Sequence, residues 1–190
     1  SPDNSKMIYG VDDVSRRQYK LFLKDLKTCQ TTDLGIANTS GYAVWANDNK
    51  TIFYTSNNAE TLLSEKIKRH TLGTEAAKDV VVYEEKDKTN YIGVGKSKNE
   101  KYIMIYSSAT TSSETRLLDA TQPNGNFFVF LSRIKDDLYD VTPLEDKFLV
   151  TTNKDALNFK VMETPLNKTG AENWKDFIPH RKDVLMEGIS

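Results

Sequence analysis

The chain has 190 residues, the length of one domain, and its 38% hydrophobic and 28% charged content is ordinary for a globular protein. Its 26 Lys and Arg residues nearly balance 27 Asp and Glu residues, so the net charge of −1 gives no drive toward nucleic acid or an anionic membrane surface. The longest apolar run, Phe127–Leu131, is far too short to cross a bilayer and no signal peptide is visible, so neither a membrane nor a nucleic-acid partner is expected.

Strand signals dominate the chain. Runs of β-branched and aromatic residues bounded by polar turns begin at Tyr19–Leu23 and recur throughout. Helical periodicity over a long window is missing, and the best candidate, Asn58–Ser64, would span barely two turns. We therefore expect an all-β fold.

The predicted strands fall into a cycle of four that restarts about every 45–50 residues. The complete cycles are predicted at 42–45, 51–54, 65–71 and 80–83; at 91–94, 102–106, 115–119 and 127–131; and at 138–141, 147–151, 158–163 and 174–178. Four strands with this period are typical of a β-propeller blade. The predicted fold class is therefore all-β, a partial β-propeller with about three complete four-stranded antiparallel blades and parts of two more.

The domain organisation follows from this cycle. We expect a partial blade at 1–38, blades at 39–88, 89–136 and 137–183, and the start of another blade at 184–190, where 184–188 has the pattern of a first strand. A closed propeller needs at least four blades, so the chain is expected to be a piece of a larger propeller that ends in mid-cycle on both sides.

One sequence phrase recurs at the start of each cycle. The phrase is found at 1–11, 44–55, 95–106 and 143–152, where a polar or acidic turn runs into a group of apolar residues. It predicts a tight hairpin between the first two strands of a blade. A single sheet of this size buries too little apolar surface to be stable, so neighbouring blades must cover both of its faces. The charged runs 86–88, 98–100 and 135–137 are expected to be solvated loops.

The only cysteine, Cys29, excludes an internal disulfide framework and fits a reducing, cytoplasmic compartment. It follows the predicted turn Asp25–Thr28, and no His lies near it in sequence. Because a nucleophilic thiol needs an oriented base, we expect a structural or surface thiol.

Catalytic, cofactor and metal motifs are not found in the sequence. It contains no Gly-x-Ser-x-Gly and no phosphate-binding glycine loop, and His70 and His180 are spaced for no metal motif. We therefore predict no catalytic, cofactor-binding or metal-binding residue in this sequence. Other candidate residues have structural interpretations. The Asn-x-Ser/Thr triplets that begin at Asn38, Asn49 and Asn167 suit turns better than glycan attachment. Asp48 lacks the other ligands of a calcium loop, and Trp45 and Trp174 suit a blade core.

Two adjacent arginines, Arg16 and Arg17, lead into the strand at Tyr19. Neighbouring strand residues point to opposite faces, so one arginine could be exposed while the other reaches a carboxylate of the fold. A structural salt bridge is the favoured interpretation, and a contact with a partner remains the alternative.

Several segments together resemble one family along essentially the whole chain. They are DDVSRRQYKLFLKDLKT, VWANDNKTIFYT, TLLSEKIKRHTLGT, VYEEKDKTNY, SSATTSSETRLLDA, FVFLSRIKDDLYD and ENWKDFIPHRKDVLMEGI. This set is similar to the propeller of oligopeptidase B, also called protease II, in the prolyl oligopeptidase family of serine peptidases. Two departures are local: Thr28-Cys29 stands where the family usually has Thr-Gly, and 138–143 lacks a His common there.

The resemblance implies a seven-bladed propeller that caps an α/β-hydrolase domain, which would follow in the parent chain as its partner. Such enzymes cleave short peptides after Arg or Lys, and the propeller admits peptides while excluding folded proteins. No triad or specificity motif of the family has a counterpart here, so the fragment alone is expected to be inactive and to need no cofactor.

The incomplete ring bears on an alternative function and on association. The alternative function is a free-standing propeller-like module that binds a protein or glycan, which the mid-cycle ends argue against. An open stack would also expose an apolar blade face at each end, which favours self-association.

Overall fold

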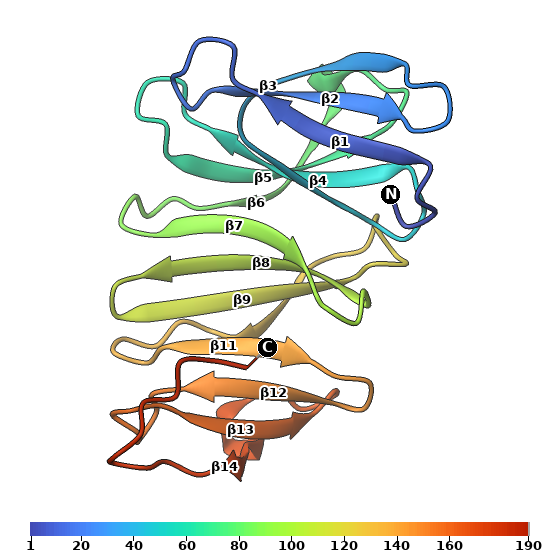
Figure 1. Ribbon diagram of the computed structural model, residues 1–190. Coiled ribbons are helices and arrows are strands. Elements are labelled where there is room, and N and C mark those ends of the chain that lie inside the picture. The colour runs from blue at the N-terminus through green and yellow to red at the C-terminus, as the bar shows by residue number, and fades with distance from the viewer. Residues whose placement is uncertain (190) are drawn as a thin grey trace.

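The computed structural model describes residues 1–189, which form fourteen strands and two short 3₁₀ turns. In chain order the strands make three antiparallel sheets that lie one above another (Figure 1). No helix among these residues is long and apolar enough to span a membrane.

The first sheet has six strands in sequential order. These are β1 (Lys6–Val11), β2 (Tyr19–Asp25), β3 (Thr31–Trp45), β4 (Thr51–Asn57), β5 (Ser64–Thr71) and β6 (Val80–Glu84). The long β3 serves two units: Thr31–Thr39 pairs with β2, whereas Thr39–Trp45 pairs with β4. The partial unit and the first complete unit therefore share a strand, and are one sheet in the structure.

Two four-stranded sheets follow, each with its first strand at one edge. The second sheet contains β7 (Tyr91–Lys96), β8 (Tyr102–Ala109), β9 (Ser112–Asp119) and β10 (Phe128–Leu131). The third contains β11 (Tyr139–Pro143), β12 (Lys147–Thr152), β13 (Lys160–Pro165) and β14 (Lys175–Ile178). The 3₁₀ turns η1 (Ala76–Lys78) and η2 (Ala171–Asn173) each precede the last strand of a unit.

Three apolar clusters fill the spaces that the stacking creates. Leu21, Ile36, Ile52 and Tyr54 form the first, within the six-stranded sheet where β2 and β3 meet β4. Val44, Phe53 and Ile67 meet Ile92, Ile103 and Ile105 in the second. Met104, Leu117 and Phe130 meet Val141, Phe148 and Val150 in the third. Residues from successive units contribute to the same cluster, so each unit depends on its neighbour for burial.

The recurring sequence phrase forms recurring turns. The side chains of Asp3, Asp48 and Asn99 each accept a hydrogen bond from the backbone N–H two residues further on, at 3.0, 3.0 and 3.2 Å. The Asp48 carboxylate also accepts from the backbone and hydroxyl of Thr51, so it closes a hairpin. Such self-made turns explain why a polar Asp or Asn precedes the second strand of a unit.

The all-β fold and the partial propeller predicted from the sequence are confirmed. The helical candidate Asn58–Ser64 is instead a turn between β4 and β5, in which Asn58 caps its own loop through Glu60 and Thr61. Residues 184–188 form no strand in the structure, and their assignment to a further blade stays a prediction, as do the other blade limits.

Candidate functional site

We define the inner wall as the surface along β7 and β11, the edge strands of their sheets, and along the Thr39–Trp45 part of β3, beyond its pairing with β2. These are the first strands of the three complete units. Tyr42 on β3, Tyr106 on β8 and Asp140 on β11 supply its polar groups. Tyr106 reaches this edge because Gly95 on β7 has no side chain: a Cβ there would lie 3.1 Å from the Tyr106 ring. The glycine in the edge strand therefore lets a second-strand tyrosine contribute to the wall.

Tyr106 is influenced electrostatically by the other two groups of the inner wall, which come from different units. Desolvation, followed by repulsion from Asp140 and Tyr42, raises the pKa of Tyr106 to about 12. Desolvation likewise raises the pKa of Asp140, even though the residue as a whole is exposed. Both groups therefore favour their neutral forms more than they would in water.

A second polar cluster joins the first two complete units. The Glu85 carboxylate accepts hydrogen bonds from Tyr83 at 2.7 Å and Ser107 at 2.6 Å, and Arg133 lies 3.4 Å away. Burial opposes ionisation of Glu85, but these donors outweigh it and lower its pKa. Because the partners come from β6, β8 and the segment after β10, the cluster fixes how the sheets stack.

A neighbouring ion pair extends this cluster. Arg116 contacts Glu114 at 2.6 Å and lies over the Tyr83 ring at 4.7 Å, while the other Glu114 oxygen accepts from the Arg133 backbone N–H at 3.2 Å. The two arginines are thus matched by Glu85 and Glu114, and the cluster is electrically balanced. It acts as a connection between sheets and leaves no charge free for a ligand.

A buried polar trio lies in the first complete unit. The Asp79 carboxylate contacts His70 Nδ1 at 2.7 Å and accepts from the Tyr54 hydroxyl at 2.7 Å, with the side chains of His70 and Asp79 only 1% exposed. The arrangement has the base and the orienting acid of a hydrolase triad, but among residues 1–189 no nucleophile lies against His70 Nε2, which is buried there without a hydrogen-bond partner. It holds β4, β5 and the start of β6 together.

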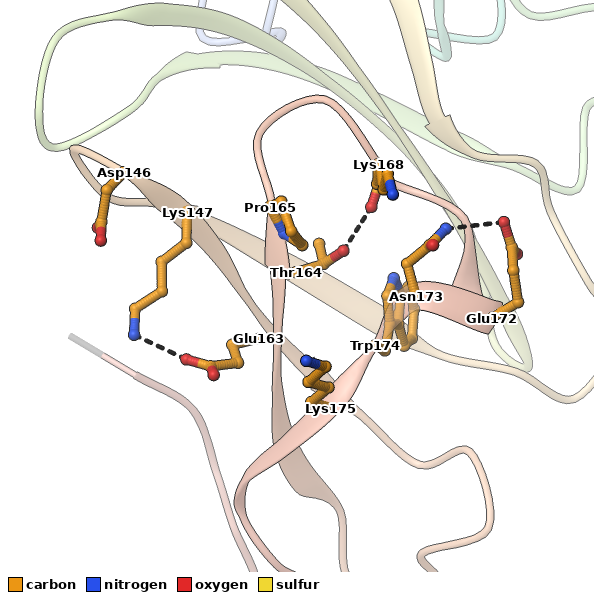
Figure 2. A pocket seen from close by; sticks show the side chains of 10 residues that line it. All are labelled: Asp146, Lys147, Glu163, Thr164, Pro165, Lys168, Glu172, Asn173, Trp174 and Lys175. Atoms are coloured by element: carbon orange, nitrogen blue, oxygen red, sulfur yellow. Dashed lines mark hydrogen bonds and ion pairs between the residues drawn. The ribbon is translucent and has the colours of Figure 1, made fainter.

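One hollow lies on the third sheet, beside η2 (Figure 2). It has a volume of about 420 Å³, and its lining includes Trp174 and, on one side, the Lys147–Glu163 ion pair, 2.7 Å long. The indole packs against Phe130 and Tyr139, so Trp174 belongs to the core, as expected from the sequence. Acidic and basic side chains alternate around the rim, which gives the hollow no clear charge preference.

A further hollow of about 390 Å³ lies against β11 and is closed on one side by Leu185, Met186 and Glu187. Asn158 holds this final segment through three hydrogen bonds. Its backbone N–H donates to His180 Nε2 at 3.3 Å, its side chain donates to the Lys182 carbonyl at 2.8 Å, and its carbonyl accepts from the Met186 N–H at 2.9 Å. Nothing in the sequence pattern indicated this role for Asn158.

Arg16 and Arg17 lie in the β1–β2 loop rather than in a strand, and neither makes an ion pair with the described residues. The favoured salt-bridge interpretation was therefore wrong. The Asp12 carboxylate instead accepts the backbone N–H groups of both arginines, at 3.2 and 2.7 Å, and so shapes the loop. This leaves both guanidinium groups in solvent.

Three further residues that the sequence offered as candidate sites lie in turns. Cys29 is an exposed free thiol in a turn, at φ 61°, the left-handed region that usually takes glycine. Asn49 binds the backbone of Asp3, and Asn167 lies in the exposed turn after β13. Among residues 1–189 no group of three or more His, Cys, Asp or Glu side chains is arranged to hold a metal ion.

The fold defines a partial β-propeller, and comparison with known proteins gives its family. The whole chain, residues 1–190, matches the family described as "Prolyl oligopeptidase, N-terminal beta-propeller domain", so the chain belongs to that family. It is 40% identical over 190 residues to "Dipeptidyl aminopeptidase BI" of Pseudoxanthomonas mexicana, and 33% identical over 167 residues to "Protease 2" of Moraxella lacunata. These alignments cover 100% and 87% of the chain.

Solved structures agree with the fold. Oligopeptidase B from Leishmania major superposes with a TM-score of 0.87 at 25% identity, covering 97% of this chain and 26% of that one. Oligopeptidase B from Trypanosoma brucei gives a TM-score of 0.80 at 26% identity, covering 95% and 25%. The chain spans about a quarter of the length of its curated relatives, 26% and 24% for the two above.

Proposed function

We propose that this chain is the peptide-admitting part of a serine oligopeptidase whose catalytic residues lie in an α/β-hydrolase domain of the same parent protein. The observation that carries the proposal is the inner wall: Tyr42, Tyr106 and Asp140 present polar groups along the free strand edges, whereas the spaces between sheets are filled by apolar side chains. Stacked blades leave a central channel of limited width, which suits a filter for substrate size.

We further propose that the parent cleaves short peptides after Arg or Lys and that the fragment alone is inactive. Similarity to oligopeptidase B structures and to a "Protease 2" supports the first part. The second part is supported by the geometry of the buried trio, since His70 Nε2 has no nucleophile as a hydrogen-bond partner in the part of the chain that the structure describes.

A second candidate function is favoured by one observation. The relative with 40% identity is named a dipeptidyl aminopeptidase, so the parent could instead release dipeptides from the amino end of its substrates. The two activities differ in whether a free substrate amino group is required, and that difference can be measured.

The test is an assay of the full-length parent with chromogenic amides of Arg and Lys, each with a free and with a blocked amino end. We expect turnover of the blocked substrates and its loss after treatment with a serine-reactive phosphonate. Turnover of free-ended dipeptide amides alone would favour the second candidate. Hydrolysis by the isolated chain, abolished by the phosphonate, would contradict the claim that the fragment is inactive.

A further inference from the structure

The row of side chains along the inner wall has a gap at Gly93 on β7. Tyr42, Gly93 and Asp140 each lie three residues before the end of the first strand of their unit. In all three units that end pairs with a fully buried residue of the second strand, so the three positions are equivalent. Tyr42 and Asp140 are exposed, whereas a Cβ added to Gly93 would meet no atom within 4 Å. The middle position, the Gly93 gap, is therefore open space and is not filled by a neighbour.

The backbone of β7 is unpaired along the same stretch, because β7 is the edge strand of its sheet. The Ser97 N–H donates to the Tyr102 carbonyl at 2.9 Å. Since the hydrogen bonds of an antiparallel pair alternate, Gly93 bonds to β8, whereas the N–H and C=O groups of Ile92 and Val94 point away from it. Within residues 1–189 neither of these two backbones makes a hydrogen bond outside the sheet. An edge of this kind is a template for another strand.

This edge is held in a fixed position. The side chains of Ile92 and Val94 belong to the second apolar cluster, and the two residues are only 8% and 7% exposed. Their backbone groups are therefore ordered before any partner arrives, which lowers the cost of binding. Tyr91 and Tyr42, at 71% and 57%, are the most exposed aromatic residues of the chain that the structure describes, and their rings offer contact area beside the edge.

An extended peptide is the ligand that suits this edge. Donor and acceptor groups that repeat every second residue match those of another extended backbone, whatever its sequence. A helix bonds its own backbone groups internally, and folded proteins protect their strand edges, so neither offers such groups. A side chain of the added strand that lies beside Gly93 has room in the gap.

We propose that an extended segment of the substrate peptide pairs with the edge of β7 as an added strand, with the backbone groups of Ile92 and Val94 as its partners and the Gly93 gap as the space for one of its side chains. This inference rests on the proposed function, in that it says how the channel holds the peptide that it admits. It concerns the peptide backbone and is independent of the residue at the cleavage site.

The first test measures binding by the full-length parent after inactivation with a serine-reactive phosphonate, so it does not depend on catalysis. Fluorescein-labelled octapeptides carry a single N-methyl group at each backbone position in turn, and the anisotropy gives Kd. In an added strand every second N–H faces β7. We therefore expect methylation to raise Kd about tenfold at alternate positions, the size of one to two backbone hydrogen bonds, and to change it little between them.

The second test locates this pairing on β7. Gly93→Phe places a ring in the gap, so it should raise the Kd of the unmethylated octapeptide about tenfold and abolish the alternation. Gly93→Ala, whose added carbon meets no atom within 4 Å and so preserves the fold, should give a smaller rise in the same direction. The matched control is Val80→Phe, which adds a ring at a 46% exposed position of β6, the opposite edge of the first sheet, and should change neither property.

The absence of alternation in the unmodified protein would overturn the proposal. So would alternation that survives in Gly93→Phe, which would assign backbone recognition to the catalytic domain, or its loss in Val80→Phe. If Gly93→Phe fails to fold, an unchanged Kd in Gly93→Ala would have the same consequence. Hydrolysis of a short Arg amide, followed in parallel on untreated protein, reports separately whether the proposed function holds.

Discussion

At the scale of single residues, the turn at Cys29 keeps its shape although a non-glycine residue occupies a left-handed backbone conformation. The Asp25 carboxylate accepts hydrogen bonds from the backbone N–H groups of Lys27 and Thr28 at 3.0 and 2.8 Å, and these fix the turn. They hold Cys29 at φ 61°, where a side chain is unfavourable. The tight turn therefore survives although its glycine is missing.

Replacing Cys29 with glycine should stabilise the chain by about 1 kcal/mol, because glycine adopts this backbone conformation without strain. The measurement is urea unfolding of the 190-residue chain under reducing conditions. Cys29→Ala is the control, since it removes the thiol but keeps the Cβ, and it should leave the midpoint unchanged. A glycine variant no more stable than the alanine variant would show that the turn carries no strain.

Ionisation of Asp140 should destabilise the fold, whereas ionisation of a carboxyl with a lowered pKa, such as Glu85, stabilises it. Its folded-state pKa is raised above the usual 3.8, so the folded state binds the proton more tightly than the unfolded state. Ionisation of Asp140 therefore costs stability, in full above the folded-state pKa and not at all well below 3.8.

Asp140→Asn should accordingly raise the thermal unfolding midpoint at neutral pH, and this advantage should fade as the pH drops through the folded-state pKa toward 3.8. Unfolding curves at a series of pH values, for the unmodified and Asn-substituted chains, would show it. An advantage that stays constant with pH would mean that the Asp140 carboxyl is not destabilised by ionisation.

At the scale of the strands, two glycines allow β1 to approach β3 closely. A Cβ on Gly10 of β1 would lie 2.4 Å from the Gly41 Cα on β3, which is backbone and cannot move aside as a side chain could. Gly41 itself has φ 82° and lies against the Tyr19 ring. The approach of β1 to β3 thus requires glycine at both positions.

Gly10→Ala should destabilise the chain by about 2 kcal/mol, the usual cost of forcing an extra carbon into a packed contact. The matched control is Gly93→Ala on β7, where an added Cβ would meet no atom within 4 Å and the substitution should be nearly neutral. Urea midpoints of both variants give the comparison. Equal effects at the two positions would contradict the close packing of β1 on β3.

Most strands could be predicted from the sequence, because runs of β-branched and aromatic residues between polar turns indicate strands directly. Predicted strands such as 115–119 and 147–151 lie within β9 and β12. The continuity of β3 could not be predicted, since its polar stretch around Asn38–Gly41 has turn composition, yet the strand bends there at positive φ without ending.

The contacts that define the site were less accessible to sequence analysis. The hollow against β11 depends on the path of the final segment, because Leu185 and Met186 line it beside residues of β11, and Asn158 fixes that segment with backbone and side-chain hydrogen bonds. No periodicity encodes such a path. Likewise, Arg16 and Arg17 looked like strand residues with ion-pair partners, but Asp12 uses its carboxylate on the backbone amides, and this forms a loop.

At the scale of the whole molecule, the stacking leaves the first face without a neighbour. Met7 and Val11 on β1 are 42% and 37% exposed, and the rings of Tyr9 and Phe22 stack at 5.7 Å. Ile8, between them, points to the first apolar cluster. The outer face of β1 and β2 is therefore apolar in the way that blade faces are when another sheet covers them.

We expect the isolated chain to self-associate through this face. Light scattering should give a mass above that of one chain that rises with concentration, and replacing Met7 and Val11 with Glu should return it to 21.6 kDa. Leu157→Glu is the control, because Leu157 is 90% exposed but lies in the turn between β12 and β13, away from that face. A single-chain mass for the unmodified protein at high concentration would refute this expectation.

In the proposed function, the filter is a property of the whole parent. The inner wall of Tyr42, Tyr106 and Asp140 would line a channel that other blades complete, and size exclusion would depend on that ring. Chain length, rather than the sequence at the cleavage site, should therefore decide which substrates the full-length enzyme hydrolyses.

The direct measurement is kcat/KM of the full-length parent for one Arg-containing cleavage site, presented first in an octapeptide and then within a folded carrier protein that displays it on an exposed loop. The account predicts rapid cleavage of the octapeptide and no detectable cleavage of the carrier. Comparable values for both substrates would contradict the filter.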